Sequence, residues 1–160
     1  MSPKTADLCD AFEQDVAIAE PVFREYGGVA AFHGRVATVR LYEDNLFLRH
    51  TTEQPGEGRV LVIDGGGSLR RALIGGNVAA VAHKNGWAGL VIYGAVRDIV
   101  ELAEIPIGIR ALASNPLRPR GDGYGEKDVT VRVAGLTIAP GDYLYADEDG
   151  LITSKKDLTA

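Results

Sequence analysis

The sequence has little cysteine and no long apolar run, and each shortage excludes a class of protein. Its single cysteine, Cys9, cannot form an intramolecular disulfide. No uninterrupted apolar stretch approaches the roughly 20 residues that a membrane-spanning helix needs. The opening residues Met1-Ser2-Pro3-Lys4 do not lead into the charged and apolar regions of a signal peptide. We therefore expect a protein of the cytoplasm without a membrane contact.

Basic residues and metal-binding patterns are also scarce. The chain has 17 basic and 22 acidic residues, a net charge of -5, which argues against direct, sequence-independent binding of nucleic acid. His33, His50 and His83 lie far apart, without the spacing of a zinc site. No G-x-S-x-G motif indicates a serine hydrolase. A small anion that binds to a local arginine or to a helix N-terminus is still compatible with this composition.

The middle third of the sequence contains the strongest structural pattern. Two apolar, β-branched runs, at 59–63 and 87–93, predict buried strands that end at glycines. Between them, residues 77–86 have the apolar spacing of an amphipathic helix with a glycine at its C-terminus. The order strand, helix, strand predicts a βαβ unit with a right-handed crossover.

The rest of the chain predicts one α/β domain that spans residues 1–160, with a central βαβ unit and a strand-rich C-terminus. No repeat or linker divides it. Thr5 is a candidate N-cap for a helix over 6–14. Segment 45–52 fits a helix or a strand, and 114–127 is irregular. Further strands are expected at 34–41, 107–112, 128–133, 135–139, 142–146 and 150–153.

Two short motifs follow the predicted βαβ strands and could form a site. Gly75-Gly76 opens the helix, where free backbone N–H groups attract anions; it could equally be a plain entry turn. Arg97-Asp98 offers a guanidinium for a carboxylate or enolate and an oxygen ligand for a divalent cation. Asp98 is also well placed as the N-cap of a short helix over 99–103. The glycines at 65–67 lack a nucleotide-binding pattern and fit a tight turn.

Several stretches resemble one family over nearly the whole chain. They are 5–10 (TADLCD), 62–73 (VIDGGGSLRRAL), 89–98 (GLVIYGAVRD), 107–112 (IGIRAL) and 143–147 (YLYAD). The sequence is similar to the RraA-like family, which includes the regulator of ribonuclease E activity A and the class II 4-hydroxy-4-methyl-2-oxoglutarate aldolases. No glycine motif for S-adenosylmethionine supports the older description of such proteins as menaquinone methyltransferases.

The resemblance implies a swivelling β/β/α-type domain and a homotrimer with sites at subunit boundaries. For the enzymatic members it implies a Mg²⁺ or Mn²⁺ ion that stabilises a pyruvate enolate. By this resemblance Asp98 is the metal ligand, and Arg97 binds the substrate and offsets the enolate charge. The substrate carboxylate is expected at the backbone of four residues at the helix start: Gly75, Gly76, Asn77 and Val78.

One position departs from the enzymatic relatives, which carry an acid where this chain has Gly76. We expect this gap to weaken catalysis and the substitution Gly76→Asp to raise activity. The first hypothesis is a metal-dependent lyase on 4-hydroxy-4-methyl-2-oxoglutarate or oxaloacetate. The alternative is a regulator that binds ribonuclease E or a helicase, and a third is an α-keto acid-binding protein with little turnover.

Overall fold

The inner sheet is buried on both faces because its strands are apolar at successive positions. In the computed structural model, which describes residues 2–160, β4 (Val60–Asp64) turns Val60 and Val62 toward one core. Its alternate residues Leu61 and Ile63 belong to a second core on the opposite face. Parallel strands covered on both sides show this near-continuous apolar pattern, so the run that predicted a buried strand is confirmed.

The inner sheet is mostly parallel. β4 lies between β3 and β6, β7 follows β6, and these four strands run in the same direction. Three short strands extend the sheet: β2 pairs with β7, β5 pairs with the end of β6, and β8 pairs with the end of β3. The bounds are β2 (Arg24–Glu25), β3 (Phe32–Leu41), β5 (Ala72–Ile74), β6 (Gly89–Val96), β7 (Gly108–Ser114) and β8 (Gly125–Lys127).

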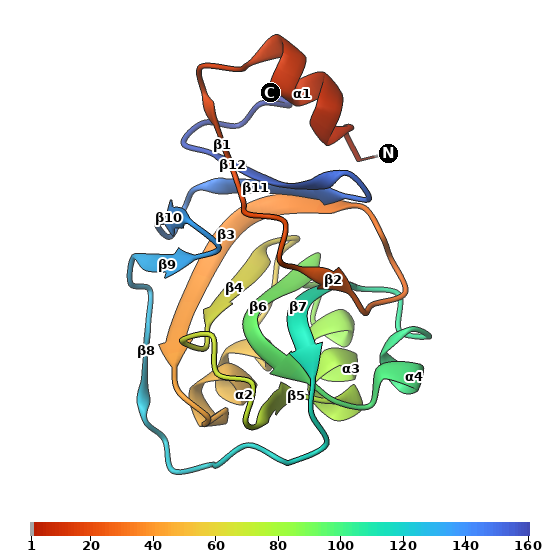
Figure 1. The fold of residues 1–160 in the computed structure, drawn as a ribbon, viewed down its shortest axis with the longest axis vertical. Helices are drawn as coiled ribbons and strands as arrows, with labels where there is room; N and C mark the ends of the chain where they lie inside the picture. The colour runs from red at the N-terminus through yellow and green to blue at the C-terminus, as the bar shows by residue number, and fades with distance from the viewer. Residues whose placement is uncertain (1) are drawn as a thin grey trace.

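The outer sheet is antiparallel and shares β3 with the inner one. Residues 32–35 of β3 pair with β11, whereas residues 36–40 pair with β4. β11 (Tyr143–Asp147) and β12 (Gly150–Ser154) form a hairpin, and β1 (Val16–Ile18) adds at its edge. A separate ribbon of β9 (Val131–Val133) and β10 (Leu136–Ile138) lies beside them (Figure 1).

Three helices cover the other face of the inner sheet, which gives the order sheet, sheet, helices (Figure 1). They are α2 (Leu46–Thr52), α3 (Gly76–Lys84) and α4 (Ile99–Leu102). The helix α1 (Thr5–Ala11) packs instead on the outer sheet, where Leu8 contacts Tyr145 and Ile152. The predicted β/β/α-type architecture is therefore confirmed, with α1 as an additional cover.

Two paired glycines leave space for the ring of Phe32 where the two sheets meet. Gly89 and Gly108 are paired across β6 and β7, and a Cβ atom on either would meet the ring of Phe32. The guanidinium of Arg110 lies 5.2 Å from the centre of the same ring. The two glycines therefore leave the space that Phe32 fills at the start of β3.

The predicted βαβ unit is present, with two changes. Helix α3 ends at Lys84 with Asn85 as its C-cap, and the next residue, Gly86, has a φ of 84°, as a terminating glycine requires. However, the helix follows the extra strand β5 rather than the loop after β4. Gly94 does not end β6, which continues to Val96 with a shift in its register to β7.

Other boundaries also differ from the prediction. Thr5 is the first residue of α1 and not its N-cap; its hydroxyl and its N–H donate to the carboxylate of Asp147, 2.7 and 2.8 Å away. The ambiguous segment 45–52 is the helix α2. The C-terminal strands are present, but the first is only β9, three residues long. No helix within residues 2–160 is long and apolar enough to cross a membrane.

Candidate active site

The register of β5 and β6 brings the two predicted motifs together. Ile74, the last residue of β5, lies opposite Val96, the last residue of β6. The next residues, Gly75 and Arg97, therefore leave the sheet side by side, and Arg97 N–H donates to the carbonyl of Ile74 over 2.9 Å. Ligands of parallel α/β sheets gather at this carboxyl edge.

Asp98 caps helix α3 from outside the helix. Its Oδ2 atom accepts a hydrogen bond of 2.9 Å from the N–H of Gly76, the first residue of α3. Gly75 has no side chain to make that bond, and a Cβ atom there would collide with the Asp98 carboxylate. Asp98 is the N-cap residue of α4, as predicted, but its side chain makes no capping hydrogen bond to that helix.

The backbone of Asp98 is held in an uncommon conformation. Its φ of 60° and ψ of 42° lie in the left-handed region, which non-glycine residues seldom adopt and which Asp and Asn tolerate better than most. Such conformations gather at functional sites, where the surroundings impose them. Here the turn from β6 into α4 sends the carboxylate back to the start of α3.

A second carboxylate, which the sequence did not reveal, fills the space beside Gly76. A Cβ atom on Gly76 would overlap the carboxylate of Glu101. Glu101, on α4, therefore occupies the space that a side chain at position 76 would take. The available signal was the short separation of Asp98 and Glu101 along the chain. The expected effect of the missing acid at Gly76 on catalysis remains a prediction.

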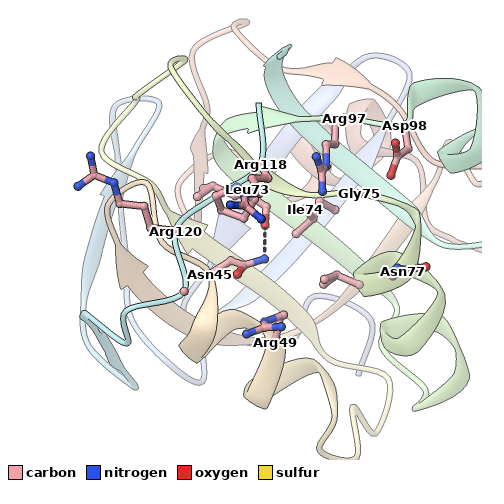
Figure 2. A pocket seen from close by; sticks show the side chains of 13 residues that line it. Asn45, Arg49, Leu73, Ile74, Gly75, Asn77, Arg97, Asp98, Arg118 and Arg120 are labelled. Atoms are coloured by element: carbon pink, nitrogen blue, oxygen red, sulfur yellow. Dashed lines mark hydrogen bonds between the residues drawn. The ribbon is translucent and has the colours of Figure 1, made fainter. Parts of the chain in front are cut away.

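An open cavity of about 300 Å³ adjoins the start of α3; Asp98 lines it, whereas Glu101 lies beside it without lining it. It is lined by Gly75, Asn77, Val78, Arg97 and Asp98, which include five of the six predicted site residues. Figure 2 shows Arg97 and Asp98 directed toward the start of α3 from the end of β6. On another side Asn45 is fixed by a 3.0 Å bond from its Nδ2 atom to the carbonyl of Leu73.

The cavity is strongly basic although the protein is acidic. Four of the chain's 12 arginines line it: Arg49, Arg97, Arg118 and Arg120. Within residues 2–160 none of these four forms a salt bridge. The protein itself does not neutralise the positive charge of these arginines, so the cavity suits an anionic ligand.

The two carboxylates fit a hard divalent cation better than zinc. Within residues 2–160 no group of three or more His, Cys, Asp and Glu side chains converges, as a closed protein metal site would require. Mg²⁺ in enzymes is commonly bound by one or two carboxylates, with water and substrate oxygens as the other ligands. Asp98 and Glu101, at successive glycines of one helix start, provide such a pair.

Comparison with known proteins identifies the family of this chain. The family model RraA-like, described as Aldolase/RraA, matches residues 5–153. The chain belongs to the RraA-like family. A relative from Alkalilimnicola ehrlichii, named "Putative 4-hydroxy-4-methyl-2-oxoglutarate aldolase", is 54% identical over 99% of this chain and 98% of its own length.

Two solved structures are similar to this RraA-like chain over nearly its whole length. The RNA-processing inhibitor RraA from Thermus thermophilis has a TM-score of 0.94 and 48% identity, and the match covers 98% of this chain and 94% of that one. A protein from Geobacillus kaustophilus described as S-adenosylmethionine: 2-dimethylmenaquinone methyltransferase has a TM-score of 0.96 and 42% identity, with 98% coverage of both chains. The relatives thus have three different names.

The glycine loop of this RraA-like chain is a closed turn. The N–H groups of Gly65 and Gly67 both donate to the carbonyl of Tyr93 over 3.1 Å. Gly66 N–H donates to the carboxylate of Asp64 over 2.9 Å. Because these amides are used within the protein, the loop fits the structural reading of a tight turn and not a nucleotide cradle.

Proposed function

We propose that this chain is a divalent-metal-dependent lyase that cleaves small α-keto acids, with 4-hydroxy-4-methyl-2-oxoglutarate and oxaloacetate as substrates. The observation that carries the proposal is the convergence of Asp98, Glu101 and Arg97 on the start of α3. The names of the relatives that are about half identical support it.

The start of α3 provides the binding site for the α-keto acid end of the substrate. The first hydrogen bond within the helix runs from Ala79 N–H to the carbonyl of Gly75. The N–H groups of Asn77 and Val78 precede it and therefore lack a partner in the helix. Since Asp98 already accepts from Gly76, the substrate carboxylate binds to Asn77 and Val78, and Arg97 binds the neighbouring keto oxygen.

The carboxylates divide the remaining tasks. Asp98 and Glu101 would hold the cation, which when bound supplies Lewis-acid polarisation of the substrate carbonyl. In aldol cleavage Glu101 accepts the proton of the substrate's C4 hydroxyl while the bond between C3 and C4 breaks. The bonding electrons stay on the C3 fragment as an enolate, and the returning proton at C3 releases pyruvate. Arg97 offsets the enolate charge.

Oxaloacetate decarboxylation uses the same enolate. Loss of carbon dioxide leaves its electron pair on C3, where Arg97 and the helix start stabilise the charge as before. One site therefore supports both reactions. The location in the cytoplasm and the homotrimer that the resemblance implies remain predictions.

The test is pyruvate release from both substrates with and without Mg²⁺ or Mn²⁺. The variants Asp98→Ala and Glu101→Gln should each lower turnover at least about 100-fold, because each removes a ligand or a proton acceptor. Glu104→Gln is the matched control, because Glu104 is exposed, lies two residues beyond α4 and is not the glutamate that a Cβ atom on Gly76 would meet. Metal-independent turnover, or full turnover of Asp98→Ala, would refute the proposal.

A second candidate function rests on the similarity to the structure of an RNA-processing inhibitor at 48% identity. In that case the chain binds ribonuclease E or a helicase and regulates it. The acid missing at Gly76 favours this alternative, whereas the nearby carboxylate of Glu101 supports the lyase. A pull-down with either partner decides it: no binding at micromolar concentration would exclude this function.

A further inference from the structure

Two arginines line the cavity without a task in the proposed chemistry. Arg49 belongs to α2, and Arg118 belongs to the irregular loop 115–124. Figure 2 shows both on the Asn45 side of the cavity, apart from Asp98, whereas Arg120 points away from it. The Nη2 atom of Arg49 lies 3.7 Å from the position that a Cβ atom on Gly121 would take, so its guanidinium lies under the loop.

The loop that carries Arg118 is fixed although it has no regular structure. Its backbone is bound to the protein on both sides of Arg118, by bonds of 2.8 to 3.0 Å. These bonds are Ala72 N–H to Leu117 O, Arg71 Nη1 to Arg118 O, Arg120 N–H to Glu43 O, and Asn45 N–H to Arg120 O. The backbone that carries Arg118 is therefore fixed before a ligand binds, which lowers the conformational entropy lost on ligand binding.

Neither guanidinium is neutralised by the protein. Within residues 2–160 neither Arg49 nor Arg118 forms a salt bridge, and the one carboxylate that lines the cavity, Asp98, lies at the start of α3. A guanidinium presents a planar fork of donors that matches a carboxylate. A pair of such groups at one end of a cavity, with an α-keto acid site at the other, indicates a ligand that is anionic at both ends.

We propose that Arg49 and Arg118 bind a second carboxylate of the substrate, the one on the fragment that departs in aldol cleavage. This proposal rests on the proposed function and adds to it the residues that hold the second carboxylate of its substrate. The α-keto acid end binds at Arg97 and α3, and the cavity extends from there to Arg49 and Arg118.

The same contact has the opposite consequence for decarboxylation. The second carboxylate of oxaloacetate leaves as neutral carbon dioxide, so a guanidinium that holds its charge stabilises the ground state more than the transition state. Arg49 and Arg118 therefore favour aldol cleavage over decarboxylation. Their removal lowers the first activity and does not lower the second to the same extent.

The experiment compares two substrates that differ in the second carboxylate. They are 4-hydroxy-4-methyl-2-oxoglutarate and 4-hydroxy-4-methyl-2-oxopentanoate, in which a methyl group replaces it, and pyruvate release is measured with Mg²⁺. The parent protein should prefer the dicarboxylate by about 10- to 100-fold in kcat/KM, as a charge-assisted hydrogen bond provides. Arg118→Gln and Arg49→Gln should lose most of that preference, chiefly through KM for the dicarboxylate. Arg132→Gln, on β9, is the control for loss of one surface charge.

A separate measurement distinguishes failure of this proposal from failure of the proposed function. Exchange of the pyruvate methyl protons with deuterated solvent needs only the α-keto acid end of the site. If the parent protein exchanges these protons but does not prefer the dicarboxylate, the proposal is overturned and the lyase survives. Equal losses on both substrates in the arginine variants also overturn it. If the parent shows neither exchange nor cleavage, both fail.

Discussion

The position of Glu101 reverses the effect expected of a substitution at Gly76. A side chain at residue 76 would occupy the space of the Glu101 carboxylate. We therefore predict that Gly76→Ala, which adds only one methyl group, lowers activity although it removes no functional group. Gly76→Asp should lower it as well, because two carboxylates would compete for one position.

The structure separates the cost in stability from the cost in activity. The atoms that a new Cβ would meet are the end of an exposed, flexible side chain, so Glu101 can rotate aside at a cost of about 0.5–1.5 kcal/mol. Replacing glycine by alanine inside a helix recovers about 0.5–1 kcal/mol, so the free energy of unfolding should change little. Loss of the proton acceptor, in contrast, should slow turnover about 10²- to 10⁴-fold.

The assay is pyruvate release from 4-hydroxy-4-methyl-2-oxoglutarate with Mg²⁺, with thermal unfolding of each variant measured in parallel. The double variant Gly76→Asp with Glu101→Ala moves the acid back to residue 76 and should be more active than either single variant. Glu104→Ala again serves as the control for loss of a nearby charge. The two substitutions touch the same space, so their effects should not add.

Two results would refute this reasoning. If Gly76→Ala is as active as the parent protein, the Glu101 carboxylate is not needed beside the helix start. If Gly76→Asp is more active while Glu101 is present, the acid at residue 76 makes a contribution that Glu101 does not replace, as the sequence alone suggested.

Two further predictions concern stability. Burial by itself raises the pKa of Asp147, but the hydrogen bonds from Thr5, Asp149 and Gly150 outweigh it and lower the pKa below its ordinary value of 3.8. The carboxylate therefore contributes stability above that pH, and this contribution is lost as the pH falls below it. Asp147→Asn should destabilise the protein at pH 7 by about 0.5–2 kcal/mol, as loss of a helix cap does, and should reduce the loss of stability in acid. If thermal unfolding of this variant depends on acid pH as that of the parent protein does, the assignment is contradicted. Gly108→Ala should destabilise the protein by about 1–3 kcal/mol because its methyl group meets the buried ring of Phe32. The control is Gly121→Ala, where the nearest atom to the new methyl group is 3.7 Å away. Equal melting temperatures for the two variants would show that the Phe32 ring can move aside.

The sequence was sufficient to predict the central elements because their patterns are local. The apolar runs of β4 and β6 and the spacing within α3 each reflect burial of one short segment. β1, β2 and β5 were missed because each is only two or three residues long, and each exists through its partner strand rather than through its own composition. The role of Thr5 was mispredicted for the same reason, because its hydrogen-bond partner Asp147 is 142 residues away in the chain.

The site was predicted in part for a similar reason. Arg97-Asp98 and the glycines at 75 and 76 are short contiguous motifs, and their juxtaposition follows from two parallel strands with a common edge. The substitute acid Glu101 and the arginines at 49 and 118 come from different elements, a helix turn and an irregular loop. Their approach depends on the path of the backbone, which hydrophobic periodicity does not specify.

The strand β3 has a consequence for how the chain folds. Because its first four residues pair with β11 and the next five pair with β4, one continuous strand links the two sheets. The outer sheet also joins β1, near the amino end, to β11 and β12, near the carboxyl end. Pairings between segments so distant in sequence form slowly, since long loops must close first. The chain should therefore unfold as one cooperative unit, and refolding should depend on the last strands to be synthesised.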